Sequence, residues 1–149
     1  MRFRVAFVGF AGPRARRIAD AIGRSSSLSV EPVVVKEGKA DSVELANGFG
    51  AVFVSTDLGA GRLAALVAEI RRENPHVPVV LTYGTEPGGK TFELARTEDC
   101  WLFSEIDPLK RGLTAEEIAR ELEAKDEASE LSSRLMEISM LSGPCSTGD

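Results

Sequence analysis

Short apolar runs alternate with segments of helical periodicity along most of this chain, and that alternation constrains its fold more than any other feature. The runs typical of buried strands are 3–10, 30–35, 51–54, 77–83 and 100–103. The segments with helical spacing between them are 13–22, 41–47, 63–73 and 90–96. Neighbouring parallel strands need helical crossovers, so the pattern predicts an α/β fold with a five-stranded, doubly wound parallel sheet.

The last part of the chain differs from the rest. Thr114 and Glu117 have the spacing of a capping box, and no glycine or proline follows until Gly143. We therefore expect an extended C-terminal helix. The predicted organisation is an α/β domain over 1–124, a helical extension over 125–142 that could form a coiled coil, and a flexible tail over 143–149.

Apolar residues of this extension recur at steps of four and three, which is the spacing of a coiled-coil seam. The predicted seam residues are Leu131, Leu135 and Ile138. They favour a homodimer formed through the C-terminal helix. The alternative is a helix that folds back on its own domain.

Composition excludes several classes of function. The net charge of −5 gives no overall field for nucleic-acid phosphates, and a single histidine excludes multi-histidine metal sites. No apolar run approaches the length of a membrane span, and the start of the chain has no signal-peptide pattern. Two cysteines make no disulfide framework. We expect a cytoplasmic protein without metal, cofactor, nucleic acid or membrane insertion.

Ligands of doubly wound sheets bind at the carboxyl ends of the strands, which directs attention to the segments after each apolar run. Ile70 to Thr82 contains Pro75-His-Val-Pro-Val-Val-Leu-Thr82, and Asp57-Leu-Gly59 follows the third run. With the five strand–helix units, these residues resemble a response-regulator receiver domain of the CheY type over roughly residues 3–124. The resemblance implies transfer of a phosphoryl group to an aspartate after strand three, with a magnesium ion.

The match to the receiver pattern is partial. Thr82 fits the family's switch hydroxyl, while the acceptor position falls on Ser55 or on Asp57, depending on how the third strand is counted. Gly9 to Gly12 replace the family's acidic pair, and Phe103-Ser-Glu105 stands where the family has Lys-Pro. Magnesium binds weakly to one carboxylate. We therefore predict a degenerate, non-enzymatic pseudo-receiver that signals through protein–protein contacts, with a phosphorylatable receiver using Asp57 as an alternative.

A second alternative rests on the segment after the fourth apolar run. Gly84, Gly89, Lys90 and Thr91 complete the phosphate-binding loop pattern Gly-x4-Gly-Lys-Thr, between a predicted strand and a predicted helix. This pattern favours a nucleotide-binding protein in which Lys90 reaches the terminal phosphates. The competing interpretation is a turn-rich Gly-Pro loop, because nucleotide-binding folds place this loop after the first core strand.

Overall fold

The computed structural model describes residues 2–36, 39, 41–83, 88–104 and 113–127. Its elements run in the order β1 (Arg2–Val8), α1 (Gly12–Arg24), β2 (Ser29–Val35), α2 (Ser42–Asn47), β3 (Ala51–Ser55), the 3-10 helix η2 (Thr56–Leu58), α3 (Ala60–Glu73), β4 (Val79–Tyr83), α4 (Gly89–Thr97) and β5 (Trp101–Ser104). A C-terminal helix follows over residues 115–127. The predicted alternation of strands and helices is confirmed, with small shifts at the ends of elements.

The strands form one parallel sheet in the order β2-β1-β3-β4-β5. This is the flavodoxin-like order, and it reverses direction between β1 and β3. Every residue of β3 and β4 is buried, as expected of central parallel strands. Pro32, which lacks a backbone donor, lies in β2 at the edge of the sheet, where that lack is tolerated. The predicted doubly wound parallel sheet is confirmed.

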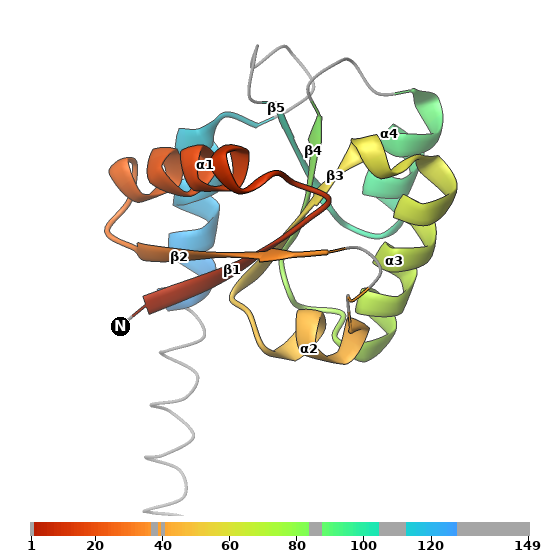
Figure 1. Cartoon of the computed structure of the whole chain (residues 1–149), viewed down its shortest axis with the longest axis horizontal. Coiled ribbons are helices and arrows are strands. Elements are labelled where there is room, and N and C mark those ends of the chain that lie inside the picture. The colour runs from red at the N-terminus through yellow and green to blue at the C-terminus, as the bar shows by residue number, and fades with distance from the viewer. Residues whose placement is uncertain (1, 37–38, 40, 84–87, 105–112, 128–149) are drawn as a thin grey trace, which may run out of the picture.

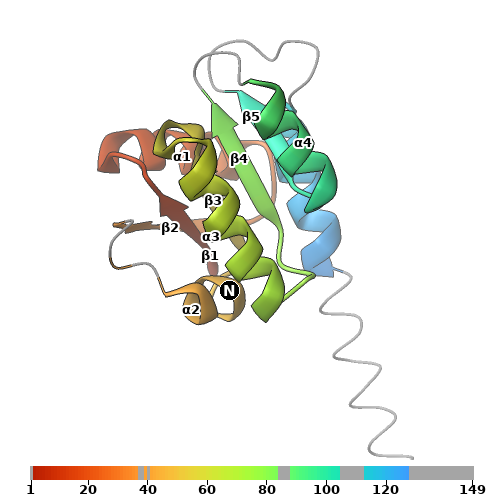
Figure 2. The same ribbon diagram turned by 90° about the vertical axis from the view of Figure 1, so that its right-hand side faces the viewer.

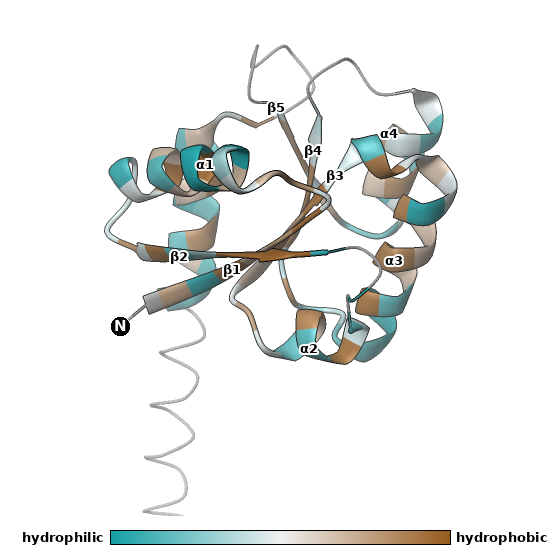
Figure 3. Ribbon diagram, viewed as in Figure 1, coloured by the Kyte–Doolittle hydropathy of each residue, from teal (hydrophilic) through white to brown (hydrophobic). Residues whose placement is uncertain are grey.

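Helices cover both faces of the sheet (Figures 1 and 2). On one face, α1 and the C-terminal helix bury Ala15, Ile18, Ala19, Ile22, Ile118, Ala119 and Leu122. On the other, α2, α3 and α4 bury Leu45, Ala46, Leu63, Val67, Ile70 and Ala95. Figure 3 shows the same division as hydropathy, with apolar strands inside and mixed helices outside. Burial of apolar surface on both faces is the main stabilising contribution.

The start of the C-terminal helix has the predicted capping box. The Glu117 amide donates to the Thr114 hydroxyl, and the Thr114 amide donates to the Glu117 carboxylate, both at 3.2 Å. Two helix-start donors are satisfied in this way. The predicted seam residues Leu131, Leu135 and Ile138, and the predicted tail 143–149, lie outside the described residues. Within the described ranges, no helix combines the length and apolarity needed to cross a bilayer.

Candidate functional site

The carboxyl ends of the central strands bring two hydroxyl side chains together at one end of the sheet. Ser55 is the last residue of β3, and it pairs in register with Thr82 of β4. Both residues are fully buried. Because the order of strands reverses between β1 and β3, this end of the sheet is where the fold places a ligand site. We call the surroundings of Ser55 and Thr82 the mouth of the sheet.

The structure distinguishes the two positions that the sequence left open as the acceptor. Ser55 ends the strand, and Asp57 lies two residues further on, in η2. The Ser55 hydroxyl accepts a hydrogen bond from the Asp57 amide at 3.2 Å, which caps the 3-10 turn. The side chain of Asp57 is 74% exposed. The residue at the end of the strand is therefore a serine, and the carboxylate projects from the turn beyond it.

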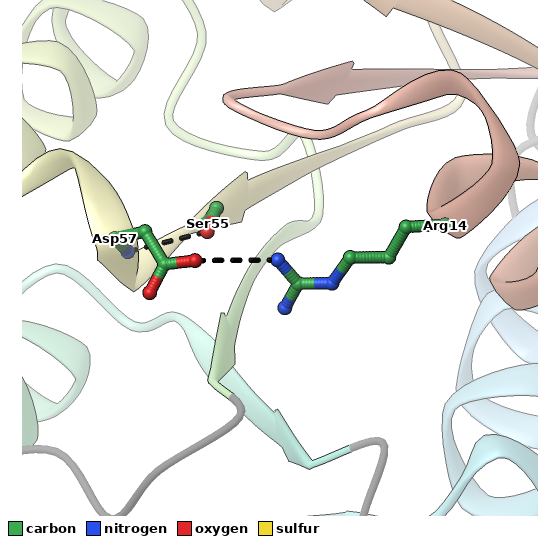
Figure 4. A network of polar contacts seen from close by, with 3 residues as sticks. All are labelled: Arg14, Ser55 and Asp57. Carbon is green, nitrogen blue, oxygen red and sulfur yellow. Dashed lines mark hydrogen bonds and ion pairs between the residues drawn. The ribbon is translucent and has the colours of Figure 1, made fainter.

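An arginine from the first helix reaches that carboxylate. Nη1 of Arg14 lies 3.4 Å from Oδ2 of Asp57, and the Arg14 side chain is only 20% exposed (Figure 4). The guanidinium also stacks 4.8 Å from the centre of the Phe10 ring. Arg14 thus approaches the mouth from α1 and holds a positive charge beside its exposed acid.

The two positions directly after β1, where receivers carry their acidic pair, are occupied by Gly9 and Phe10. Gly9 has a φ of +82°, and a Cβ there would lie 3.0 Å from Cδ2 of Leu58. Phe10 is buried and packs edge to face on Phe7, with ring centres 5.3 Å apart. A left-handed backbone and close contact with η2 favour glycine at position 9. In the described part of the chain, no group of three acidic, histidine or cysteine side chains could hold a metal ion.

Thr82 has an unusual environment for a hydroxyl. Its Oγ1 is buried and has no hydrogen-bond partner among the described residues. A buried hydroxyl without a partner is costly, because its hydrogen bonds to water are lost and not replaced. Thr82 is thus at the position that the receiver resemblance assigns to the switch hydroxyl, beside Ser55 and on the same face of the sheet.

The described part of the phosphate-binding pattern forms the start of α4. Gly84 lies outside the described residues, and Gly88 precedes the helix. The Thr91 amide donates to the Gly88 carbonyl at 3.1 Å, so it does not point to a ligand. A Cβ on Gly88 or Gly89 would meet no described protein atom within 4 Å. Lys90 is exposed and Thr91 is buried. Residues 84–87, which would form most of such a loop, lie outside the described residues, so both interpretations of this segment stay predictions.

Sequence reasoning missed the partner of Asp57. Arg14 is one of three arginines that closely follow Pro13, and nothing in their spacing singles it out. Arg14 and Asp57 are 43 residues apart, and they meet only because α1 and η2 both begin at the mouth. Strand five ends at Ser104, and no lysine is present at that end in the described residues.

The order of strands and the layers of helices define a flavodoxin-like α/β fold. Solved structures with the same fold include a candidate pilus assembly-related protein from Burkholderia pseudomallei K96243, with a TM-score of 0.59 and 16% identity over 82% of this chain and 87% of that chain. A candidate pilus assembly protein from Burkholderia thailandensis E264 has a TM-score of 0.57 and 12% identity over 85% of this chain and 99% of that one.

The same fold is present in NtrX from Brucella abortus, whose structure was solved in complex with ADP. It has a TM-score of 0.56 and 21% identity, and the match covers all of this chain and 30% of NtrX. At these identities the likeness is one of fold. No family profile and no curated protein matches the sequence.

Proposed function

We propose that this chain is a receiver-like signalling module that works through protein contacts and is not phosphorylated. The observation that carries the proposal is the ion pair of Arg14 and Asp57 at the mouth of the sheet. A working receiver places several carboxylates around a metal ion. Among the described residues of this chain, the one carboxylate at the mouth of the sheet is that of Asp57, and it forms an ion pair with Arg14.

The chemistry of phosphoryl transfer supports this proposal. The transfer depends on a cation that neutralises charge developing on the phosphoryl oxygens. Magnesium is held by carboxylate oxygens, and a single carboxylate holds it weakly. Gly9 and Phe10 provide no such oxygen from a side chain, and Nη1 of Arg14 lies 3.4 Å from the Asp57 carboxylate. A magnesium ion would have to compete with Arg14 for one acid.

Phosphorylation is tested with acetyl phosphate and with beryllofluoride, each in the presence of magnesium. We expect no phosphoryl adduct by intact-mass measurement and no chemical-shift change at the mouth with beryllofluoride. The variants Asp57→Ala and Ser55→Ala are the matched controls. A stoichiometric adduct that disappears in Asp57→Ala but persists in Ser55→Ala would replace this proposal with a phosphorylatable receiver.

We further propose that the module is a homodimer and that its C-terminal helix takes part in the contact. The seam spacing of Leu131, Leu135 and Ile138 supports this, because a row of large apolar side chains is unfavourable in water. In this scheme the α/β domain receives the signal, and the helical extension joins it to a second copy or to an output partner.

A further inference from the structure

Charge is distributed unevenly between the two ends of this chain. Residues 1–36 contain seven Arg or Lys and two Asp or Glu, for a net charge of +5. Residues 113–149 contain nine acidic and three basic side chains, for a net charge of −6. The basic end includes α1 and the acidic end includes the C-terminal helix. These two helices cover the same face of the sheet (Figure 1).

The exposed face of α1 has an alternating row of charges. Arg16, Asp20 and Arg24 follow one another at steps of four residues, so they lie along one side of the helix. All three are exposed. We call this row, positive-negative-positive, the α1 stripe.

The C-terminal helix has the opposite row. Glu116, Arg120 and Glu127 are separated by four and seven residues, which again places them on one side of a helix. All three are exposed. We call this row, negative-positive-negative, the C-terminal stripe. Each of its charges is opposite in sign to the corresponding charge of the α1 stripe, and this holds for a parallel and for an antiparallel pairing of the two helices.

The two stripes do not neutralise each other within one chain. None of their six residues forms an ion pair with another described residue. A groove of about 450 Å³ lies between the end of α1 and the start of the C-terminal helix, and Arg24 lines it on one side and Glu116 on the other. Its remaining lining comes from Ala21, Ser25, Thr114 and Ala115.

We infer that a second copy of this chain docks on this face, with each α1 stripe against the C-terminal stripe of the other copy. A two-fold axis along the groove exchanges the two helices between copies, as a self-complementary contact requires. It sets Arg24 opposite Glu116 of the second copy, Asp20 opposite its Arg120, and Arg16 opposite its Glu127. Every contact occurs twice, and among these six residues no like charges face each other.

The charges select the partner and the register of the two helices, and they contribute only a small part of the binding free energy. Exposed ion pairs contribute little each and are screened by salt, whereas complementary charge selects orientation and disfavours wrong partners. The small side chains of Ala21 and Ala115 allow the helices to approach closely along the groove. The dimer is therefore expected to weaken as ionic strength rises.

This inference rests on the homodimer of the proposed function and names the surface that forms it. The test compares the unmodified full chain with three variants. One variant inverts the α1 stripe (Arg16→Glu, Asp20→Arg, Arg24→Glu). A second inverts the C-terminal stripe (Glu116→Arg, Arg120→Glu, Glu127→Arg). The third combines all six changes.

Self-association is measured by analytical ultracentrifugation at low and moderate salt. Each triple variant brings like charges together, so its dissociation constant should rise at least about tenfold over the unmodified chain. An equimolar mixture of the two triple variants restores both contacts and should form a heterodimer, and the sixfold variant should dimerise again. Circular dichroism checks that each variant is folded. Arg72→Glu, an exposed change of the same net charge as the first triple, is the matched control on α3 and should have no effect.

The outcomes separate this inference from the proposed function. If both triple variants dimerise as tightly as the unmodified chain, the inference is wrong, and a dimer held by the predicted seam remains. If the unmodified chain is monomeric at high micromolar concentration, both the inference and the homodimer are wrong, and the face is left for a different protein. The inference is also wrong if both triple variants are monomeric and their equimolar mixture forms no heterodimer.

Discussion

At the scale of single residues, Cys100 shows how burial controls reactivity. Its thiol lies half-buried just before β5, and desolvation raises its pKa from 9.0 to about 11. The positive charge of Arg71 acts in the opposite direction but is the smaller effect. Only the thiolate is a strong nucleophile, so Cys100 should be inert near neutral pH.

Thiol labelling of a Cys145→Ser variant tests this, because Cys100 is then the only cysteine. Its reaction with a maleimide at pH 7.5 should be about 100-fold slower than that of free cysteine. The reason is that raising the pKa from 9.0 to about 11 lowers the fraction of thiolate about 100-fold at that pH. The rate should keep rising through pH 10. The folded state favours the neutral thiol, so unfolding free energy should fall as pH rises from about 9 towards 11. Labelling as fast as free cysteine at pH 7.5 would contradict the assigned burial.

At the scale of elements, Arg71 joins α3 to the segments that lead into β4 and β5. Its Nε donates to the Glu98 carbonyl at 2.8 Å and its Nη2 to the Asp99 carbonyl at 3.0 Å, while Nη1 donates to the Val77 carbonyl. Asp99 has a φ of +54°, a conformation that such a contact helps to hold. One guanidinium therefore satisfies three backbone acceptors from two loops.

Replacement of Arg71 by alanine should lower the free energy of unfolding by about 1.5–3 kcal/mol, because hydrogen bonds from a charged donor to two half-buried carbonyls and one exposed carbonyl are lost. Urea denaturation gives the measurement. Arg72→Ala is the matched control, since Arg72 is exposed on the same helical turn, and it should change stability by less than about 0.5 kcal/mol. Equal effects of the two variants would show that the three acceptors are satisfied without Arg71.

The elements were predictable because each depends on nearby residues. Apolar runs predicted the strands, helical spacing over 13–22 predicted α1, and the Thr114–Glu117 spacing predicted the start of the C-terminal helix. The site was less predictable. Whether Ser55 or Asp57 ends β3 depends on a local hydrogen bond from the Asp57 amide to the serine hydroxyl, which no periodicity reveals. The pairing of Asp57 with Arg14 depends on how two distant loops meet.

At the scale of the whole molecule, the predicted seam of Leu131, Leu135 and Ile138 is a second proposed contact between copies of the chain. Burying a leucine-sized side chain contributes about 1.5–3 kcal/mol, so a few across a dimer axis support association at micromolar concentration. Leu131→Asp with Leu135→Asp should therefore weaken the dimer and leave the sheet intact, as measured by light scattering and circular dichroism. Ser132→Asp with Ser133→Asp has the same added charge outside the seam and is the control. An unchanged dimer in the leucine variant would remove the seam from the interface.

The glycine after β1 restricts which side chains the chain can carry at the mouth of the sheet. An aspartate at position 9 would need a left-handed backbone and a displacement of Leu58, whose Cδ2 lies 3.0 Å from the site of the new Cβ. An aspartate at position 10 would remove a ring that packs on Phe7 and under Arg14. Either substitution should therefore give a less stable protein, because the packing between the end of β1 and η2 disfavours a carboxylate at both positions.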